Sequence, residues 1–155
     1  MERFNLESGD LERERAEPEG WTWRATGVGE RLGASMIGAT LYELPPGGRS
    51  FPYHYEYGCE EWLLVVSGTP TLRDPDGEHE LVPGDVVCFP EGPEGAHLVH
   101  NRTDGPVRVL LLSTKGRPAI AVYPDSGKVG ARSITGERIV LGRPGPLLDY
   151  WDGED

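Results

Sequence analysis

The sequence lacks long hydrophobic runs, and this absence excludes a membrane-spanning helix. No apolar stretch approaches the roughly 18–20 residues that such a helix needs. The first four residues, Met1-Glu2-Arg3-Phe4, contain neither the basic nor the apolar segment that opens a secretion signal. The only cysteines are Cys59 and Cys88, too few for a disulfide framework in a chain of 155 residues. Together these absences predict a cytoplasmic protein.

Positive charge is also scarce in this chain. It has 15 lysines and arginines against 26 aspartates and glutamates, so its formal net charge is −11. A protein this acidic is repelled by nucleic-acid phosphates and by anionic membrane surfaces. We therefore expect no nucleic-acid partner and no membrane partner, and we look for a small-molecule ligand instead.

The sequence also lacks long segments that could form an amphipathic helix. The chain has 22 glycines and 14 prolines, and no segment of ten or more residues combines helical apolar spacing with freedom from both. Instead, short β-rich runs alternate with turns such as Asp74-Pro75-Asp76-Gly77 and Val82-Pro83-Gly84-Asp85. This alternation predicts an all-β sandwich or barrel.

The expected strands are short and closely spaced. They cover Trp21–Ala25, Ser35–Leu44, Phe51–Tyr55, Glu61–Val66, Thr69–Arg73, Glu78–Leu81, Asp85–Phe89, His97–Asn101, Val107–Ser113, Ile120–Tyr123, Val129–Ser133 and Arg138–Leu141.

The length fits one domain with an extension at each end. Residues 1–20 are polar and acidic, so we expect a solvated arm or a first edge strand. Residues 21–118 would form the β-barrel core. Residues 119–155 would form a C-terminal extension that packs on the barrel or on a partner subunit, because its last residues are too apolar for a free tail. These residues are Leu147, Leu148, Tyr150 and Trp151.

Two of the expected strands are apolar on both faces. The runs are Trp62–Val66 and Val107–Leu112, whereas a strand with one face in water should alternate between apolar and polar residues. We therefore expect the barrel interior on one side of them and another sheet or a second subunit on the other. On this basis the sequence predicts a homodimer.

Residues suited to metal binding converge in the middle of the chain. His54 and Glu56 share one face of a strand because they are two positions apart. Tyr57-Gly58-Cys59 can then turn the chain, so that Glu61 on the next strand points back at them. His97 begins a further strand and supplies a fourth candidate.

The spacing of these residues resembles the two motifs of the cupin superfamily. The first motif reads G-x5-H-x-H-x3-4-E-x6-G, and the second reads G-x5-P-x-G-x2-H-x3-N. The matching positions are Gly48, His54, Glu61 and Gly68, then Gly84, Pro90, Gly92, His97 and Asn101. The resemblance spans about residues 35–115 and implies a small single-domain cupin, which is a jelly-roll antiparallel β-barrel, here with short N- and C-terminal extensions.

The chain departs from the cupin pattern at two places. Glu56 stands where the first motif has its second histidine. The second motif contains two extra residues, Pro93 and Glu94, before His97. The longer loop leaves the placement of His97 open.

The resemblance implies that a divalent metal ion, such as Fe, Mn, Zn or Ni, binds inside the barrel. Its ligands would be His54, Glu61 and His97, with Glu56 at the altered position; imidazole and carboxylate groups suit first-row metals. Glu56 could instead accept a hydrogen bond behind the ligands or act as a general base. Glu60 competes with Glu61, although strand parity and the gap to Gly68 favour Glu61. A barrel without metal would leave a pocket for a ligand.

These features favour a metal-dependent enzyme that acts on a small organic metabolite, of the isomerase, lyase or dioxygenase type, with Glu56 as the general base. The alternative is a non-catalytic cupin that binds or senses a small molecule. We expect the pocket to be mostly apolar and to suit a small organic acid or carbonyl compound better than a sugar. The expected lining residues are Leu63, Val65, Val99 and Asn101.

Overall fold

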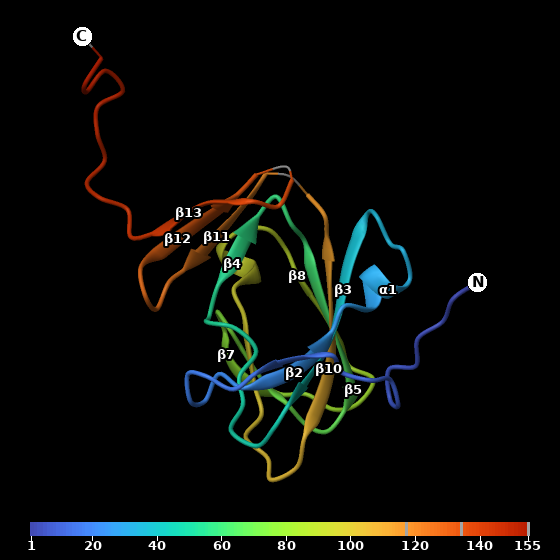
Figure 1. The fold of residues 1–155 in the computed structure, drawn as a ribbon. Coiled ribbons are helices and arrows are strands. Elements are labelled where there is room, and N and C mark those ends of the chain that lie inside the picture. The colour runs from blue at the N-terminus through green and yellow to red at the C-terminus, as the bar shows by residue number, and fades with distance from the viewer. Residues whose placement is uncertain (117, 134, 155) are drawn as a thin grey trace.

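The computed structural model of the chain describes residues 1–116, 118–133 and 135–154. Its architecture is almost entirely antiparallel β-structure, as Figure 1 shows. The strands form sheets of six, four and three members. The predicted all-β, jelly-roll class is thus confirmed, but the sheets pack as a sandwich and do not close into one continuous barrel.

The six-stranded sheet contains the longest strands. Its order is β1-β2-β3-β10-β5-β8, and each neighbouring pair is antiparallel. The bounds are β1 Arg13–Arg15, β2 Trp23–Thr26, β3 Ile37–Leu44, β5 Glu61–Ser67, β8 Val86–Phe89 and β10 Val107–Thr114.

Two smaller sheets complete the fold. One has the order β13-β12-β11-β4, and the other has the order β7-β6-β9. The bounds are β4 Tyr55–Tyr57, β6 Thr71–Asp74, β7 Gly77–Glu80, β9 Leu98–His100, β11 Ala119–Tyr123, β12 Lys128–Arg132 and β13 Arg138–Gly142.

The described helical segments are very short. They are α1, Val28–Arg31, and the 3-10 turn η1, Pro93–Gly95. Neither could reach across a bilayer, and the described residues contain no other helix that could.

The core lies between the sheets, where apolar side chains of six strands meet. Alternation along β5 sends Leu63 and Val65 inward, and both are completely buried. They pack with Leu44, Leu72, Phe89, Val99, Val107 and Val109. This packing fixes β5 and β8 beside one another and thereby sets the position of the first residue of β5, Glu61.

The outer face of the six-stranded sheet is covered in part by the chain's own N-terminal segment. Leu41 and Leu110 are buried there beneath Phe4, Leu6 and Leu11. We expected another sheet or a second subunit to cover the outer face of the doubly apolar strands, and residues 1–20 provide part of this cover. We also expected residues 1–20 to form either a solvated arm or a first edge strand, and they contain the edge strand β1. A homodimer stays a prediction.

One predicted strand is shifted along the chain. We expected Phe51–Tyr55, whereas β4 begins only at Tyr55. Pro52 has no N–H to donate to a ladder, and His54 makes only an isolated bridge. The ordered pairing therefore starts one residue after His54.

The C-terminal residues do not dock on the rest of this chain. After β13 the backbone runs away from the sheets (Figure 1), and Leu147, Leu148, Tyr150 and Trp151 are exposed. Packing on the barrel is therefore not what the structure shows. Packing on a partner subunit stays a prediction.

Asn101, the last residue of the second motif, ties two loops to the core. Its Nδ2 donates to the carbonyl oxygens of Leu44 and Gly105, at 2.9 and 2.7 Å. Its Oδ1 accepts from the backbone N–H of Thr103 at 2.9 Å. Because Asn101 is completely buried, these bonds satisfy groups that water cannot reach. The role of Asn101 is structural.

We expect Asn101→Ala to lower the free energy of unfolding by about 2–3 kcal/mol, because it removes three hydrogen bonds and leaves the buried carbonyl oxygen of Leu44 without the Asn101 donor. Chemical denaturation measures the change. Thr103→Val is the comparison, since it removes a half-exposed hydroxyl group that lies 2.7 Å from Asn101 Oδ1 but leaves both Asn101 Nδ2 bonds in place, and it should cost less than about 1 kcal/mol. Equal losses in the two variants would contradict this role for Asn101.

Candidate metal centre

A backbone pair brings the two histidines of the motifs together. His54 and His97 form an isolated antiparallel bridge, in which each backbone N–H donates to the other's carbonyl, at 3.2 and 2.9 Å. Directly opposite residues in such a pair project to the same face. The ring centroids are accordingly 4.9 Å apart.

The two extra residues before His97 do not disturb this pair. Pro93 and Glu94 are absorbed by η1, which follows Gly92 in a left-handed conformation with φ of 87°. Only glycine adopts this conformation without strain. The insertion therefore bulges as a single turn, and His97 keeps its place opposite His54.

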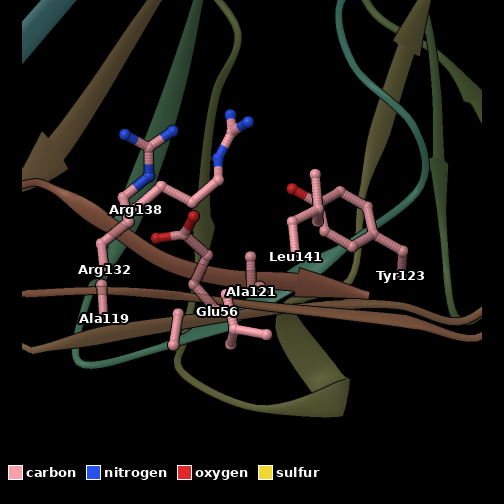
Figure 2. Close-up of a pocket in the computed structure, with 10 residues that line it drawn as sticks. Glu56, Ala119, Ala121, Tyr123, Arg132, Arg138 and Leu141 are labelled. Carbon is pink, nitrogen blue, oxygen red and sulfur yellow. The ribbon is translucent and has the colours of Figure 1, made fainter. Parts of the chain in front are cut away.

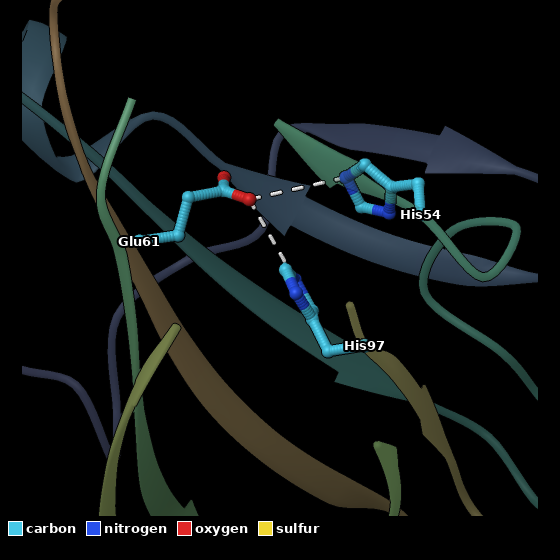
Figure 3. A group of neighbouring side chains, drawn as sticks. All are labelled: His54, Glu61 and His97. Atoms are coloured by element: carbon cyan, nitrogen blue, oxygen red, sulfur yellow. Dashed lines mark ion pairs between the residues drawn. The ribbon is translucent and has the colours of Figure 1, made fainter. Parts of the chain in front are cut away.

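Glu61 completes the group from a third strand (Figure 3). Its Oε2 lies 3.9 Å from Nε2 of His54 and 3.7 Å from Nε2 of His97. The neighbouring carboxylate of Glu60 points elsewhere and accepts a hydrogen bond from Trp62 Nε1 at 2.8 Å. The structure thus brings Glu61, not Glu60, to the histidines.

The histidine rings are held in one orientation and one tautomer. Nδ1 of His54 lies 2.9 Å from the carbonyl oxygen of Pro52, and Nδ1 of His97 lies 2.9 Å from that of Gly95. A carbonyl only accepts, so each Nδ1 carries the proton and each Nε2 keeps its lone pair toward Glu61. Phe89 stacks on the His97 ring, with centroids 3.8 Å apart.

Burial keeps both imidazoles neutral. It lowers the pKa of His54, and together with the nearby His54 ring it lowers the pKa of His97 to about 3. Burial and the negative charge of Glu56 raise the pKa of Glu61 to about 8. Glu61 therefore has no cation beside it, so its contacts with the rings are not salt bridges.

This donor set suits a divalent metal ion. The described residues contain one group of three such side chains, His54, Glu61 and His97, with donor atoms within 4.8 Å of one another. Ligands at about 2.0–2.2 Å from one ion lie up to about 4 Å apart, and Glu61 Oε2 lies within this distance of both histidine Nε2 atoms. Backbone carbonyls behind both Nδ1 atoms are the usual support for metal-ligating histidines. The three residues could therefore hold a metal.

Glu56 stands beside this group and does not belong to it. It lies on β4, where its backbone pairs with Ala121 of β11. Its carboxylate enters a pocket with Tyr123, Arg132 and Arg138, shown in Figure 2. The structure therefore unites three of the four predicted site residues and places the fourth on the adjoining wall.

The cavity next to the centre is polar on several sides. It has a volume of about 650 Å³ and contains Glu56 and Glu61 together with Lys115 and Arg132. This size is suitable for a small metabolite. The site therefore includes basic residues that we did not predict.

The predicted apolar lining is wrong. Leu63, Val65, Val99 and Asn101 are buried in the core and are not part of this cavity. Their strands place them deeper than the metal ligands, where packing excludes both water and ligand. The prediction that these side chains point inward is correct, but the prediction that they line the ligand cavity is not.

The sequence analysis missed Tyr123, Arg132 and Arg138. Tyr123 stacks on the ring of His54, with centroids 5.7 Å apart. All three belong to β11–β13, which we regarded only as a packing extension. The available signal was the pair of arginines on either side of the turn at Gly136.

The three candidate ligands lie in a segment that matches a known protein family. The family model described as "Cupin domain" matches residues 40–113, which contain His54, Glu61 and His97. Many solved structures share the fold. The chain is a small cupin-domain protein.

Two solved structures resemble this cupin over most of its length. A sugar phosphate isomerase of the cupin superfamily from Silicibacter pomeroyi is 28% identical with a TM-score of 0.79, covering 95% of this chain and 97% of that one. A protein from Acidithiobacillus ferrooxidans, provisionally assigned the same activity, is 25% identical with a TM-score of 0.78, covering 88% of each chain.

A curated relative resembles only part of the cupin. The bifunctional lysine-specific demethylase and histidyl-hydroxylase NO66 of Branchiostoma floridae is 34% identical over 74 residues. That stretch is 45% of this chain and 12% of the relative. The chain thus spans a small part of the relative's length.

We expect Glu61→Gln to stabilise the metal-free protein at alkaline pH. Because the pKa of Glu61 rises from 4.5 in a free chain to about 8, protonated Glu61 favours the fold fully below pH 4.5. This contribution is lost as the pH rises through 8. Glutamine stays neutral at every pH. The free energy of unfolding of the variant should therefore rise by roughly 2–4 kcal/mol relative to that of the wild type as the pH is raised from 5 to 8.5.

Urea denaturation of the chelator-treated proteins at the two pH values measures this gain. Glu60→Gln is the control, since that carboxylate is exposed, and it should show no such pH-dependent difference. A stability difference between Glu61→Gln and wild type that stays constant with pH would contradict the burial of this charge.

Proposed function

We propose that this cupin is a metal-dependent isomerase of small α-hydroxy carbonyl compounds. The observation that carries the proposal is the position of Glu56: a carboxylate outside the candidate ligand group that shares a cavity with the ligand Glu61. A base beside a metal is the arrangement that proton transfer next to a carbonyl requires.

The isomerisation needs one base and no second substrate. Glu56 would take the proton from the carbon that bears the hydroxyl group, breaking that C–H bond, and would return it to the former carbonyl carbon. The hydroxyl proton moves to the other oxygen. The carbonyl shifts by one carbon, and nothing is oxidised or reduced overall.

His54, Glu61 and His97 would hold the metal, which when bound polarises the substrate carbonyl and makes the adjacent C–H bond more acidic. The hydrogen bonds to Pro52 and Gly95 keep both imidazoles oriented for this task. Tyr123 stacks on the His54 ring and would help to hold this imidazole in place.

The similarity to a sugar phosphate isomerase supports this reaction class, because it extends over 95% of the chain. It also argues against our expectation that a sugar would be a poor ligand. Isomerase is the one of our three predicted reaction types that the neighbouring carboxylate favours most directly.

A second candidate is an oxygenase. Two histidines and one carboxylate have the composition of non-haem iron(II) oxygenase sites. The demethylase and hydroxylase resemblance points the same way, although it covers less than half of this chain. Dioxygen consumption by the iron(II)-loaded protein, without proton exchange into sugars, would favour this function instead.

We expect Glu56→Gln to abolish isomerisation while metal remains bound. The variant keeps the shape of the side chain but cannot accept the proton, so turnover should fall by about 10²–10⁴-fold. The measurement is deuterium uptake from D₂O into three- to six-carbon aldoses and ketoses, with and without phosphate, by protein loaded in turn with Mn²⁺, Fe²⁺, Zn²⁺ or Ni²⁺.

Glu60→Gln is the matched control, because this carboxylate lies in the loop between β4 and β5 and outside the cavity lining. Elemental analysis of each variant gives its metal content. Loss of bound metal in the Glu56→Gln variant would indicate that Glu56 is a metal ligand and not only a base. Absence of exchange in the wild type with every metal and sugar would overturn the isomerase proposal and leave the non-catalytic binding protein.

A further inference from the structure

Two arginines face each other across the C-terminal hairpin. In the pairing of β12 with β13, Arg132 lies directly opposite Arg138. A register shift between Ala131 and Arg132 produces this pair; without it, Ile139 would stand opposite Arg132. Bulges of this kind commonly re-aim side chains near functional sites.

This arrangement is electrostatically unfavourable by itself. Like charges directly opposite on neighbouring strands destabilise a sheet. Neither guanidinium forms an ion pair or a hydrogen bond with any residue that the structure describes. By contrast, Arg73 and Arg108 both have carboxylate partners. An anion between Arg132 and Arg138 would relieve their repulsion.

The two arginines lie on the same face as the catalytic candidate. Figure 2 shows both guanidinium groups on the side of the sheet toward which the Glu56 carboxylate projects. Small side chains at Ala119 and Ala121 line the same pocket, whose volume is about 30 Å³. Among the described residues, no ion pair joins either arginine to Glu56, although the carboxylate lies in the same pocket.

One of the arginines and one of the candidate metal ligands also line a common cavity. The cavity of about 650 Å³ contains Arg132 together with Glu56 and Glu61. Lys115 lines it as well and donates to the carbonyl of Ala34 at 3.0 Å, which fixes its ammonium group near the rim. A molecule in this cavity that contacts Glu61 can therefore also contact the positive charge of Arg132 or Lys115.

We propose that Arg132 and Arg138 bind the phosphate group of a phosphorylated substrate whose carbonyl end lies at His54, Glu61 and His97. This inference rests on the proposed isomerase function and names its substrate class. A phosphate monoester carries up to two negative charges and several acceptor oxygens, so it can engage two guanidinium groups at once. A single carboxylate, with one negative charge, matches this pair of monocations less completely.

The subsite lies outside the part of the chain that matches the cupin model, residues 40–113. The metal ligands come from within that match, whereas Arg132 and Arg138 come from the C-terminal extension. The extension therefore sets substrate specificity, and the cupin motifs supply the reactive centre.

The test measures binding of inorganic phosphate to the metal-loaded full chain by titration calorimetry. The variants are Arg132→Gln, Arg138→Gln and the double variant, with Arg143→Gln as the control that removes one positive charge outside the pocket lining. We expect each single variant to weaken phosphate binding about tenfold and the double variant to abolish it. Arg143→Gln should bind like the wild type.

Acetate and a neutral sugar, glucose, serve as the other probes. Acetate that binds as tightly as phosphate and with the same dependence on the arginines would overturn the choice of phosphate. Phosphate binding that is equal in the wild type and the double variant would overturn the subsite itself. Circular dichroism and metal content of each variant show whether a loss of binding comes from unfolding.

Failure of this inference is distinguishable from failure of the isomerase proposal. In the deuterium-uptake assay, the ratio of kcat/KM for phosphorylated over unphosphorylated sugars should fall at least about tenfold in the double variant. Exchange without any such change would retain the isomerase and reject the subsite. Phosphate binding that depends on the arginines, without exchange in any sugar, would retain the subsite and reject the isomerase.

Discussion

The centre of this protein depends on two backbone hydrogen bonds between His54 and His97. They join a segment before β4 to a segment before β9, which are separated by more than forty residues. Because the two residues are directly opposite, both imidazoles project to one side, and their Nδ1 atoms find carbonyl oxygens within their own segments. The position and the tautomer of each ring therefore follow from main-chain geometry, which side-chain substitutions elsewhere alter little.

Glu61 is then placed by packing and not by the histidines. Leu63 and Val65 anchor β5 in the core, and Glu61 is the first residue of that strand. It consequently meets two neutral rings in a partly buried place where its own charge is costly. A divalent ion bound here would resolve this conflict, since it would supply the positive charge that neither imidazole carries. An ionised Glu61 thus destabilises the metal-free fold but is the form that would bind a metal ion.

The cupin motifs account for the centre, and the C-terminal strands complete the cavity around it. β11 pairs with β4 and brings Tyr123 against His54, while β12 and β13 carry the arginines over Glu56. In the proposed function, the roles are divided along the chain: the motif strands would hold the reactive groups, and the C-terminal strands would select the substrate. A fold shared by many proteins can in this way serve different substrates.

The sequence by itself determined the all-β class, most strand positions and the set His54, Glu61 and His97, because strand parity, turn residues and motif spacing are local properties. Only the tertiary structure decided that Leu63 and Val99 are core, that the N-terminal residues cover the outer sheet, and that Arg138 faces Arg132. These outcomes depend on strand order, on depth within the sandwich and on one bulge. No local pattern encodes them, since each arises when segments distant in the chain are packed together.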